Sequence, residues 1–181
     1  MASPSKEENI LKLILENSPL KRWHFEEIVR EAGVSRLVAN KWLRKYVKEG
    51  LLKRVKKQGS FPYFIVGRNN TMYYSTKRLY ALKKLYNSGL ITALMNTPAK
   101  TVIIFGSIVK GDWYKDSDID IFILGEFADF DKKEYEKRLN HKIELHIFEK
   151  DIPRELANNI INGHVVKGQV QDVYRRARKN L

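Results

Sequence analysis

Residues 101–124 read TVIIFGSIVKGDWYKDSDIDIFIL. Two apolar runs rich in β-branched and aromatic residues, 101–105 and 119–124, predict two buried strands. The first run ends at Gly106-Ser107, and ten residues later the second opens with Asp118-Ile119-Asp120. This strand–turn–strand unit decides the fold of the second half of the chain, because each run is too apolar to remain in contact with water.

The ends of these strands carry chemically active groups. A Gly-Ser turn can bring backbone N–H groups and a hydroxyl close to a phosphate. Asp118 and Asp120 point to the same face of their strand, because strand side chains alternate. Neighbouring carboxylates are oxygen ligands for Mg²⁺, which pairs them with substrate phosphates. The motif therefore predicts nucleotidyl transfer.

A bland alternative for the same stretch is a turn rich in aspartate that only caps a loop. It explains Asp116 and Ser117, to which we assign no metal. It does not explain Asp120, because a charge inside an apolar strand is costly unless something pairs with it.

The composition narrows the possible classes. A chain of 181 residues suits one medium domain or two small ones. Cysteine is absent, which excludes disulfides, thiolate zinc sites and cysteine nucleophiles. The sequence shows neither a signal-peptide core nor an apolar run of membrane-spanning length. We therefore expect a soluble, cytoplasmic protein.

The net charge of +13 is distributed unevenly. Residues 36–57 contain nine Lys or Arg residues against one acid, Glu49. A basic cluster on a short segment is typical of a protein that binds a polyanion.

The first part of the chain predicts three helices followed by a hairpin. The helices cover the residues after a Ser5-x-x-Glu8 capping box up to Pro19, residues 24–32 and residues 36–49. The hairpin strands are expected at 51–55 and 61–66, around a turn that contains Gly59. We expect a nucleic-acid-binding domain at 1–67, a linker with connecting helices at 68–98, and a nucleotidyltransferase domain at 99–181.

The order of helix, helix-turn-helix and hairpin resembles a winged helix-turn-helix domain. Gly33-Val34-Ser35 stands at the turn, where Gly33 can adopt a positive φ and Ser35 can cap the third helix. The resemblance implies that the third helix enters the major groove of double-stranded DNA. An ordinary solvated helix face is the alternative. The predicted contacts are Arg36, Asn40, Lys41, Arg44, Lys45 and Lys48 on the helix and Lys56 and Lys57 on the wing.

The second part alternates strands with helices. Strands are expected at 101–105, 118–124 and 142–148, with helices at 107–111, 131–139 and 151–180. The basic run Arg175–Lys179 is expected to be a solvated helix end. The predicted fold class is α+β, with a mixed sheet in this part and the smaller helical part before it.

Residues 105–111, FGSIVKG, and 117–121, SDIDI, resemble the minimal nucleotidyltransferases of the DNA polymerase β superfamily. The resemblance implies that Gly106 and Ser107 bind the phosphates of a nucleoside triphosphate and that Asp118 and Asp120 hold Mg²⁺, with two ions expected. Lys110 is placed to neutralise phosphate charge, although a solvated Lys110 is an equal alternative. ATP is the expected substrate.

The family takes a third carboxylate from a later strand, and the candidate here is Glu144. Alternation places Lys142, Glu144 and His146 on one strand face, so a solvent-facing strand is the alternative. Glu144 would complete the metal ligands and assist the nucleophile. We expect His141, His146 and His164 to be structural; His146 is the one that faces the same way as Glu144.

The Gly-Ser-x10-Asp-x-Asp spacing is similar to that of antitoxins that adenylylate a helical HEPN toxin. This implies a separate toxin chain as a possible acceptor, beside other proteins, RNA or small molecules. A homodimer through helix 72–87 is also open. Two other functions remain open: a winged-helix regulator that senses a nucleotide without turning it over, and an enzyme acting on RNA 3′ ends.

Overall fold

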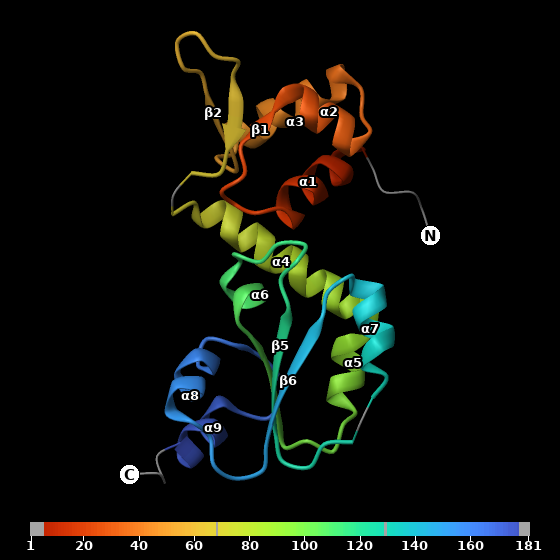
Figure 1. The fold of residues 1–181 in the computed structure, drawn as a ribbon, viewed down its shortest axis with the longest axis vertical. Coiled ribbons are helices and arrows are strands. Elements are labelled where there is room, and N and C mark those ends of the chain that lie inside the picture. Colours follow the sequence, from red (N-terminus) through yellow and green to blue (C-terminus); the bar gives the residue numbers. More distant parts are fainter. Residues whose placement is uncertain (1–5, 68, 129, 178–181) are drawn as a thin grey trace. The chain divides into compact units, whose positions relative to one another are not determined.

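A computed structural model describes residues 6–67, 69–128 and 130–177 of the chain (Figure 1). The chain divides into two compact units, Met1–Lys77 and Arg78–Leu181. The division falls inside helix α4 (Thr71–Ser88), within the segment expected to connect the two domains. In the described part of the chain, no helix is both long and apolar enough to cross a membrane.

The N-terminal unit contains three helices and a small antiparallel sheet. The helices are α1 (Lys6–Glu16), α2 (Phe25–Ala32) and α3 (Arg36–Lys48). The strands are β1 (Trp23–His24), β2 (Lys53–Val55) and β3 (Tyr63–Ile65), in the order β1-β3-β2. The predicted helices and hairpin are present, and β1 adds a third strand to the hairpin. Ser5 of the expected capping box lies outside the described residues.

The turn between α2 and α3 forms for the local reasons that the sequence indicates. Gly33 has a φ of 61°, which favours glycine. The Ser35 side chain accepts a hydrogen bond from the Val38 backbone N–H and caps α3. Gly50, with a φ of 77°, follows the end of α3.

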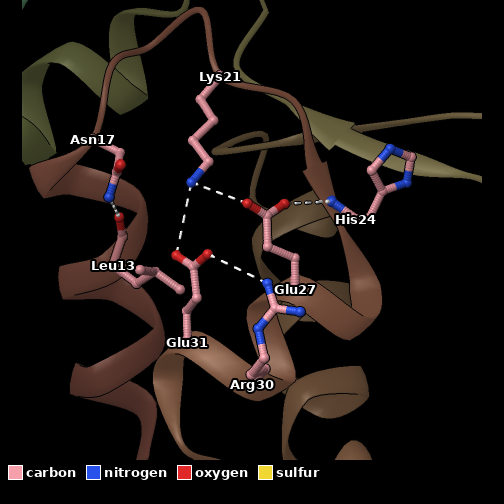
Figure 2. A network of polar contacts seen from close by, with 7 residues as sticks. All are labelled: Leu13, Asn17, Lys21, His24, Glu27, Arg30 and Glu31. Carbon is pink, nitrogen blue, oxygen red and sulfur yellow. Dashed lines mark hydrogen bonds and ion pairs between the residues drawn. The ribbon is translucent and has the colours of Figure 1, made fainter.

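A polar network ties α2 to the segment before it (Figure 2). Lys21 Nζ lies 3.0 Å from Glu27 Oε1 and 3.7 Å from Glu31 Oε2. Glu27 also accepts a hydrogen bond from the His24 backbone N–H. Because Glu27 lies in the first turn of α2, its negative charge also interacts favourably with the helix dipole.

The C-terminal unit is built on a four-stranded mixed sheet in the order β6-β5-β4-β7. Strand β4 (Thr101–Phe105) is antiparallel to β5 (Ile119–Leu124) and to β7 (His164–Lys167), whereas β5 is parallel to β6 (Ile143–Phe148). The helices are α5 (Leu90–Met95), α6 (Ser107–Lys110), α7 (Lys132–Leu139), α8 (Arg154–Ile160) and α9 (Val170–Ala177). The fold class is α+β, as predicted.

Strand β7 corrects the prediction, which gave residues 151–180 to helices. Val165 and Val166 are β-branched and favour a strand, and a glycine stands on each side of β7. A Cβ atom on Gly163 would overlap the Ile103 side chain, and Gly168 has a φ of 79°. The two glycines let β7 run close beside β4. Arg178 and Lys179 of the predicted basic helix end lie outside the described residues.

The sheet separates two apolar cores, with α5 and α7 on one side and α8 and α9 on the other (Figure 1). On β5, Ile119, Ile121 and Ile123 belong to the first core, whereas Phe122 and Leu124 belong to the second. Asp120 alternates with the isoleucines, so it faces the same side as Phe122. The acidic site therefore lies at the α8–α9 side of the sheet, where β5 begins.

Candidate active site

The Gly106–Ser107 turn brings the backbone against Asp120. Phe105 pairs with Asp120 in the β4–β5 register, and Gly106 follows directly with a φ of 74° and a ψ of −147°. A Cβ atom at Gly106 would overlap Asp120 Oδ2 and lie 3.0 Å from Asp120 Cγ. The positive φ favours glycine here, and a side chain would have to displace the Asp120 carboxylate, so the predicted phosphate-binding turn lies beside the predicted metal ligand.

Helix α6 begins at Ser107 and is a single turn. The Lys110 backbone N–H donates to the Gly106 carbonyl at 3.2 Å, and Gly111 N–H donates to the Ser107 carbonyl at 2.9 Å. Gly111 ends the turn with a φ of 81°. The Lys110 side chain is exposed, and its carbonyl accepts hydrogen bonds from Arg78. Ser107 and Lys110 thus lie one turn apart on the element that follows Gly106.

Asp120 and Glu144 are direct neighbours on two parallel strands. They are partners in the β5–β6 register. The Asp120 side chain is one-quarter exposed and the Glu144 side chain 59% exposed. Burial raises the pKa of Asp120; His146 opposes this shift, and the charges of Glu144 and Asp118 add to it. The fold thus gathers negative charge where ionisation is unfavourable, an arrangement that a bound cation would relieve.

His146 completes a group of three metal-binding side chains that the sequence prediction did not place together. One ligand atom from each of Asp120, Glu144 and His146 lies within 4.8 Å of the other two. The His146 ring packs on Phe105, with the ring centroids 5.1 Å apart. The signal was present in the alternation of β6, which puts residue 146 on the face of residue 144.

Asp118 lies just before β5 and is exposed. Within the described residues it is not part of the Asp120–Glu144–His146 group. It lines a neighbouring cavity of about 550 Å³. Polar side chains line the cavity, and they include both basic and acidic residues. The lining consists of Lys115, Asp116, Ser117, Asp118, Glu136, Asn140, His141 and Lys142.

The loop before β5 is held by hydrogen bonds. Ser117 Oγ accepts from the Tyr114 backbone N–H at 3.0 Å, and the Ser117 carbonyl lies 2.7 Å from His141 Nδ1. Ser117 therefore has the structural role that the turn interpretation gave it. His141 is buried just before β6 and supports the same loop. His164 lies on β7, at the opposite edge of the sheet from β6.

The predicted nucleic-acid contacts in the N-terminal unit are exposed on α3 and on the hairpin turn. Lys56 and Lys57 lie between β2 and β3. A cavity of about 410 Å³ lies between α3 and the hairpin. Its lining combines basic, polar and apolar side chains: Asn40, Leu43, Arg44, Val47, Lys48, Arg54 and Phe64.

Two of the predicted cations on α3 are engaged in ion pairs. Arg36 Nη2 lies 2.6 Å from Glu26 Oε1. Lys45 Nζ lies 3.2 Å from Glu7 Oε1 and 3.9 Å from Glu49 Oε1. These pairs tie α3 to neighbouring acidic side chains and engage the charges of Arg36 and Lys45.

Comparison with known proteins adds one finding. Residues 90–172 match the model of the family described as Polymerase beta, Nucleotidyltransferase. The matched segment contains β4, the Gly106–Ser107 turn, β5, β6 and β7. Neither a curated protein nor a solved structure matches the chain. Residues 90–172 are therefore similar to the polymerase β nucleotidyltransferases, which supports a nucleotidyltransferase function for this part of the chain.

Proposed function

We propose that the chain is a divalent-metal-dependent enzyme that transfers a nucleoside monophosphate from a nucleoside triphosphate, with ATP as substrate, to an acceptor hydroxyl. One observation carries the proposal: Asp120 and Glu144 are register partners on adjacent strands, and the backbone of Gly106 runs against Asp120. A paired carboxylate site beside a tight Gly-Ser turn has the parts needed to hold a metal and a polyphosphate together.

The donor atoms fit a divalent cation. Asp120 and Glu144 offer carboxylate oxygens, and the raised pKa of Asp120 reflects burial and nearby negative charge that a cation would offset. Asp118, which lies just before β5 and two residues from Asp120, would add a further oxygen from the edge of the site. When bound, the metal supplies Lewis-acid stabilisation of the transferring phosphate and of the leaving oxygens. Mg²⁺ is the ion that the sequence motif predicts.

The remaining residues of the site act on the triphosphate and the acceptor. The N–H groups and the Ser107 hydroxyl at the start of α6 would donate hydrogen bonds to the β- and γ-phosphates, and Lys110 would offset their charge. Glu144 would accept the proton of the acceptor hydroxyl. The acceptor oxygen bonds to the α-phosphorus. The bond between that phosphorus and the oxygen bridging the α- and β-phosphates breaks, and pyrophosphate leaves.

The N-terminal unit supports a second activity, binding of double-stranded DNA by a winged helix-turn-helix arrangement. The support is the order of α2, a tight turn, α3 and a hairpin, together with the exposed cations on α3 and on the turn between β2 and β3. In such an arrangement the second helix of the pair enters the major groove. Asn40 and Arg44 would read base edges, and the lysines would contact phosphates.

The acceptor is proposed by chemical class alone: a hydroxyl on a protein, an RNA end or a small molecule. A separate toxin chain is the protein acceptor that the motif spacing suggests. The competing function is a regulator that binds a nucleotide and changes its affinity for DNA without turnover. The two differ in pyrophosphate release, which only the enzyme produces.

Label transfer separates these functions. The protein is incubated with a cell lysate and ATP labelled with ³²P at the α-phosphate, with Mg²⁺ present. We expect a labelled macromolecule that disappears with the Asp118→Ala/Asp120→Ala variant and persists with Asp112→Ala/Asp116→Ala, which changes two exposed aspartates of the preceding loop. If DNA affinity responds to ATP while no pyrophosphate is released, the regulator replaces the enzyme.

A further inference from the structure

His146 is placed between the two carboxylates of the site and bonded to neither. Its Nε2 lies 3.7 Å from Asp120 Oδ1 and 3.7 Å from Glu144 Oε1. Both distances exceed the range of a hydrogen bond. The Nε2 atom is buried and has no hydrogen-bond partner among the described residues. A buried polar atom of this kind needs an explanation, because leaving it unsatisfied costs free energy.

The spacing of the donors suggests what would satisfy it. Imidazole nitrogens and carboxylate oxygens bind transition metals at about 2.0–2.2 Å, so two donors on one ion are separated by roughly 3–4 Å. The separations of 3.7 Å on both sides of His146 fall in this range. The three side chains come from two adjacent strands whose register is fixed by the parallel β5–β6 pairing.

The ring of His146 is also held in place. It packs against Phe105, the last residue of β4, with centroids 5.1 Å apart. Its side chain is about one-quarter exposed, whereas that of Glu144 is more than half exposed. A ring fixed in this way can present its nitrogen to an ion without losing much side-chain freedom on binding.

We propose that His146 is a metal ligand, and that Asp120, Glu144 and His146 form a mixed oxygen–nitrogen site that takes a transition-metal divalent cation in preference to Mg²⁺. The proposal takes the role of the metal in nucleotidyl transfer from the proposed function, and it specifies which ion binds. Its chemical basis is that imidazole is a ligand for transition metals, whereas Mg²⁺ takes oxygen ligands and keeps much of its water.

The test uses Mn²⁺ as the probe, because its unpaired electrons report their ligands. The full chain is loaded with Mn²⁺ alone, and pulsed electron paramagnetic resonance measures coupling to a directly bound nitrogen. We expect nitrogen coupling in the unchanged protein, its loss in His146→Gln, and its retention in His164→Gln, a matched control on β7 at the opposite edge of the sheet.

A titration with the same probe measures selectivity. Free Mn²⁺ is followed by its resonance signal, and Mg²⁺ is added as competitor. We expect His146→Gln to weaken Mn²⁺ binding by about tenfold or more, the size typical of disturbing a metal's ligand environment. Mg²⁺ binding should change much less, so the preference for Mn²⁺ falls.

The possible outcomes separate this proposal from the proposed function. If Mn²⁺ binds, is lost in Asp120→Asn and shows no nitrogen coupling, His146 is not a ligand, while the metal site and the proposed function stand. An unchanged ratio of Mn²⁺ to Mg²⁺ affinity in His146→Gln overturns the preference. If the unchanged protein binds neither ion, both the ligand assignment and the metal-dependent function are wrong.

Discussion

A Cβ atom on Gly106 would overlap Oδ2 of Asp120, so the turn after β4 is built against the carboxylate at the start of β5. The positive φ of Gly106, 74°, adds a second reason why a side chain is excluded. The same close approach places the N–H groups expected to bind phosphate beside the carboxylate expected to bind metal.

Gly106→Ala should therefore remove nucleotidyl transfer. Displacing the Asp120 carboxylate by even about 1 Å can lower the rate about 100-fold, and the backbone strain should cost about 1–3 kcal/mol in the free energy of unfolding. The measurements are transfer rate and thermal melting. Gly89→Ala is the control, because Gly89 has a φ of 85° but its Cβ would meet other atoms no closer than 3.7 Å. Equal loss of activity in both variants would contradict the steric explanation.

Asp120→Asn should abolish transfer and yet stabilise the metal-free protein. The folded state raises the pKa of Asp120 above the ordinary value of 3.8, mainly through burial. Ionised Asp120 therefore lowers stability as the pH rises above 3.8, and asparagine removes that cost at pH 7. We expect a melting temperature a few degrees higher in the presence of a chelator, with the difference shrinking as the pH falls toward 3.8. A lower melting temperature at pH 7 would count against this account.

A divalent metal should make the unchanged protein melt at a higher temperature than Asp120→Asn, the reverse of the order expected without metal. A ligand that binds only the folded state raises its stability, so Mn²⁺ or Mg²⁺ should raise the melting temperature of the unchanged protein and leave that of Asp120→Asn almost unchanged. A metal-induced rise of equal size in both proteins would place the metal elsewhere.

Asp172 gives a pH dependence of the opposite sign. Lys100 Nζ donates a hydrogen bond to Asp172 at 2.8 Å and, together with Thr101, lowers the pKa of this carboxyl. The stabilisation is present above pH 3.8 and lost as the pH falls through the lowered pKa. Asp172→Asn should cost about 1 kcal/mol or less at pH 7. Denaturant unfolding at several pH values checks this: the cost should disappear in acid, and a cost independent of pH would refute the ion-pair origin.

Lys41→Gln/Lys48→Gln should weaken the proposed binding of DNA, because these two exposed lysines of α3 are proposed to contact phosphates. Each lost phosphate contact lowers the slope of log affinity against log salt by about one, so the double variant should lower it by about two. Fluorescence anisotropy with a labelled duplex at several salt concentrations measures the slope. Lys12→Gln, an exposed lysine on α1, is the control and should leave the slope unchanged. If Lys12→Gln changes the slope as much per removed charge as the double variant does, binding depends on the net charge of the protein and not on contacts made by α3.

The strands β4 and β5 could be predicted from sequence because their apolar runs are long and end at clear turn residues. Strand β7 could not, because its four residues include only two consecutive valines, and its place depends on Gly163 packing against Ile103, a contact across 60 residues of sequence. Tertiary contact decided the conformation where the local preference was weak.

The candidate site, like the fold, could be predicted from the sequence only in part. The position of Asp120 inside an apolar strand was visible in the sequence, and its pairing with Glu144 follows from a parallel register that no local pattern specifies. The approach of His146 Nε2 to both carboxylates depends on that register and on the packing of the ring against Phe105. Residue types and spacing indicated the chemistry, but the distances required the fold.

Nucleotidyl transfer at the Asp120–Glu144 site is tested by comparing ATP labelled at the α-phosphate with ATP labelled at the γ-phosphate. The acceptor should gain the α label, and the γ label should appear in pyrophosphate, with both signals lost in Glu144→Gln. Transfer of the γ label to the acceptor, or no transfer from any of the four nucleoside triphosphates with either Mg²⁺ or Mn²⁺, would contradict the claim.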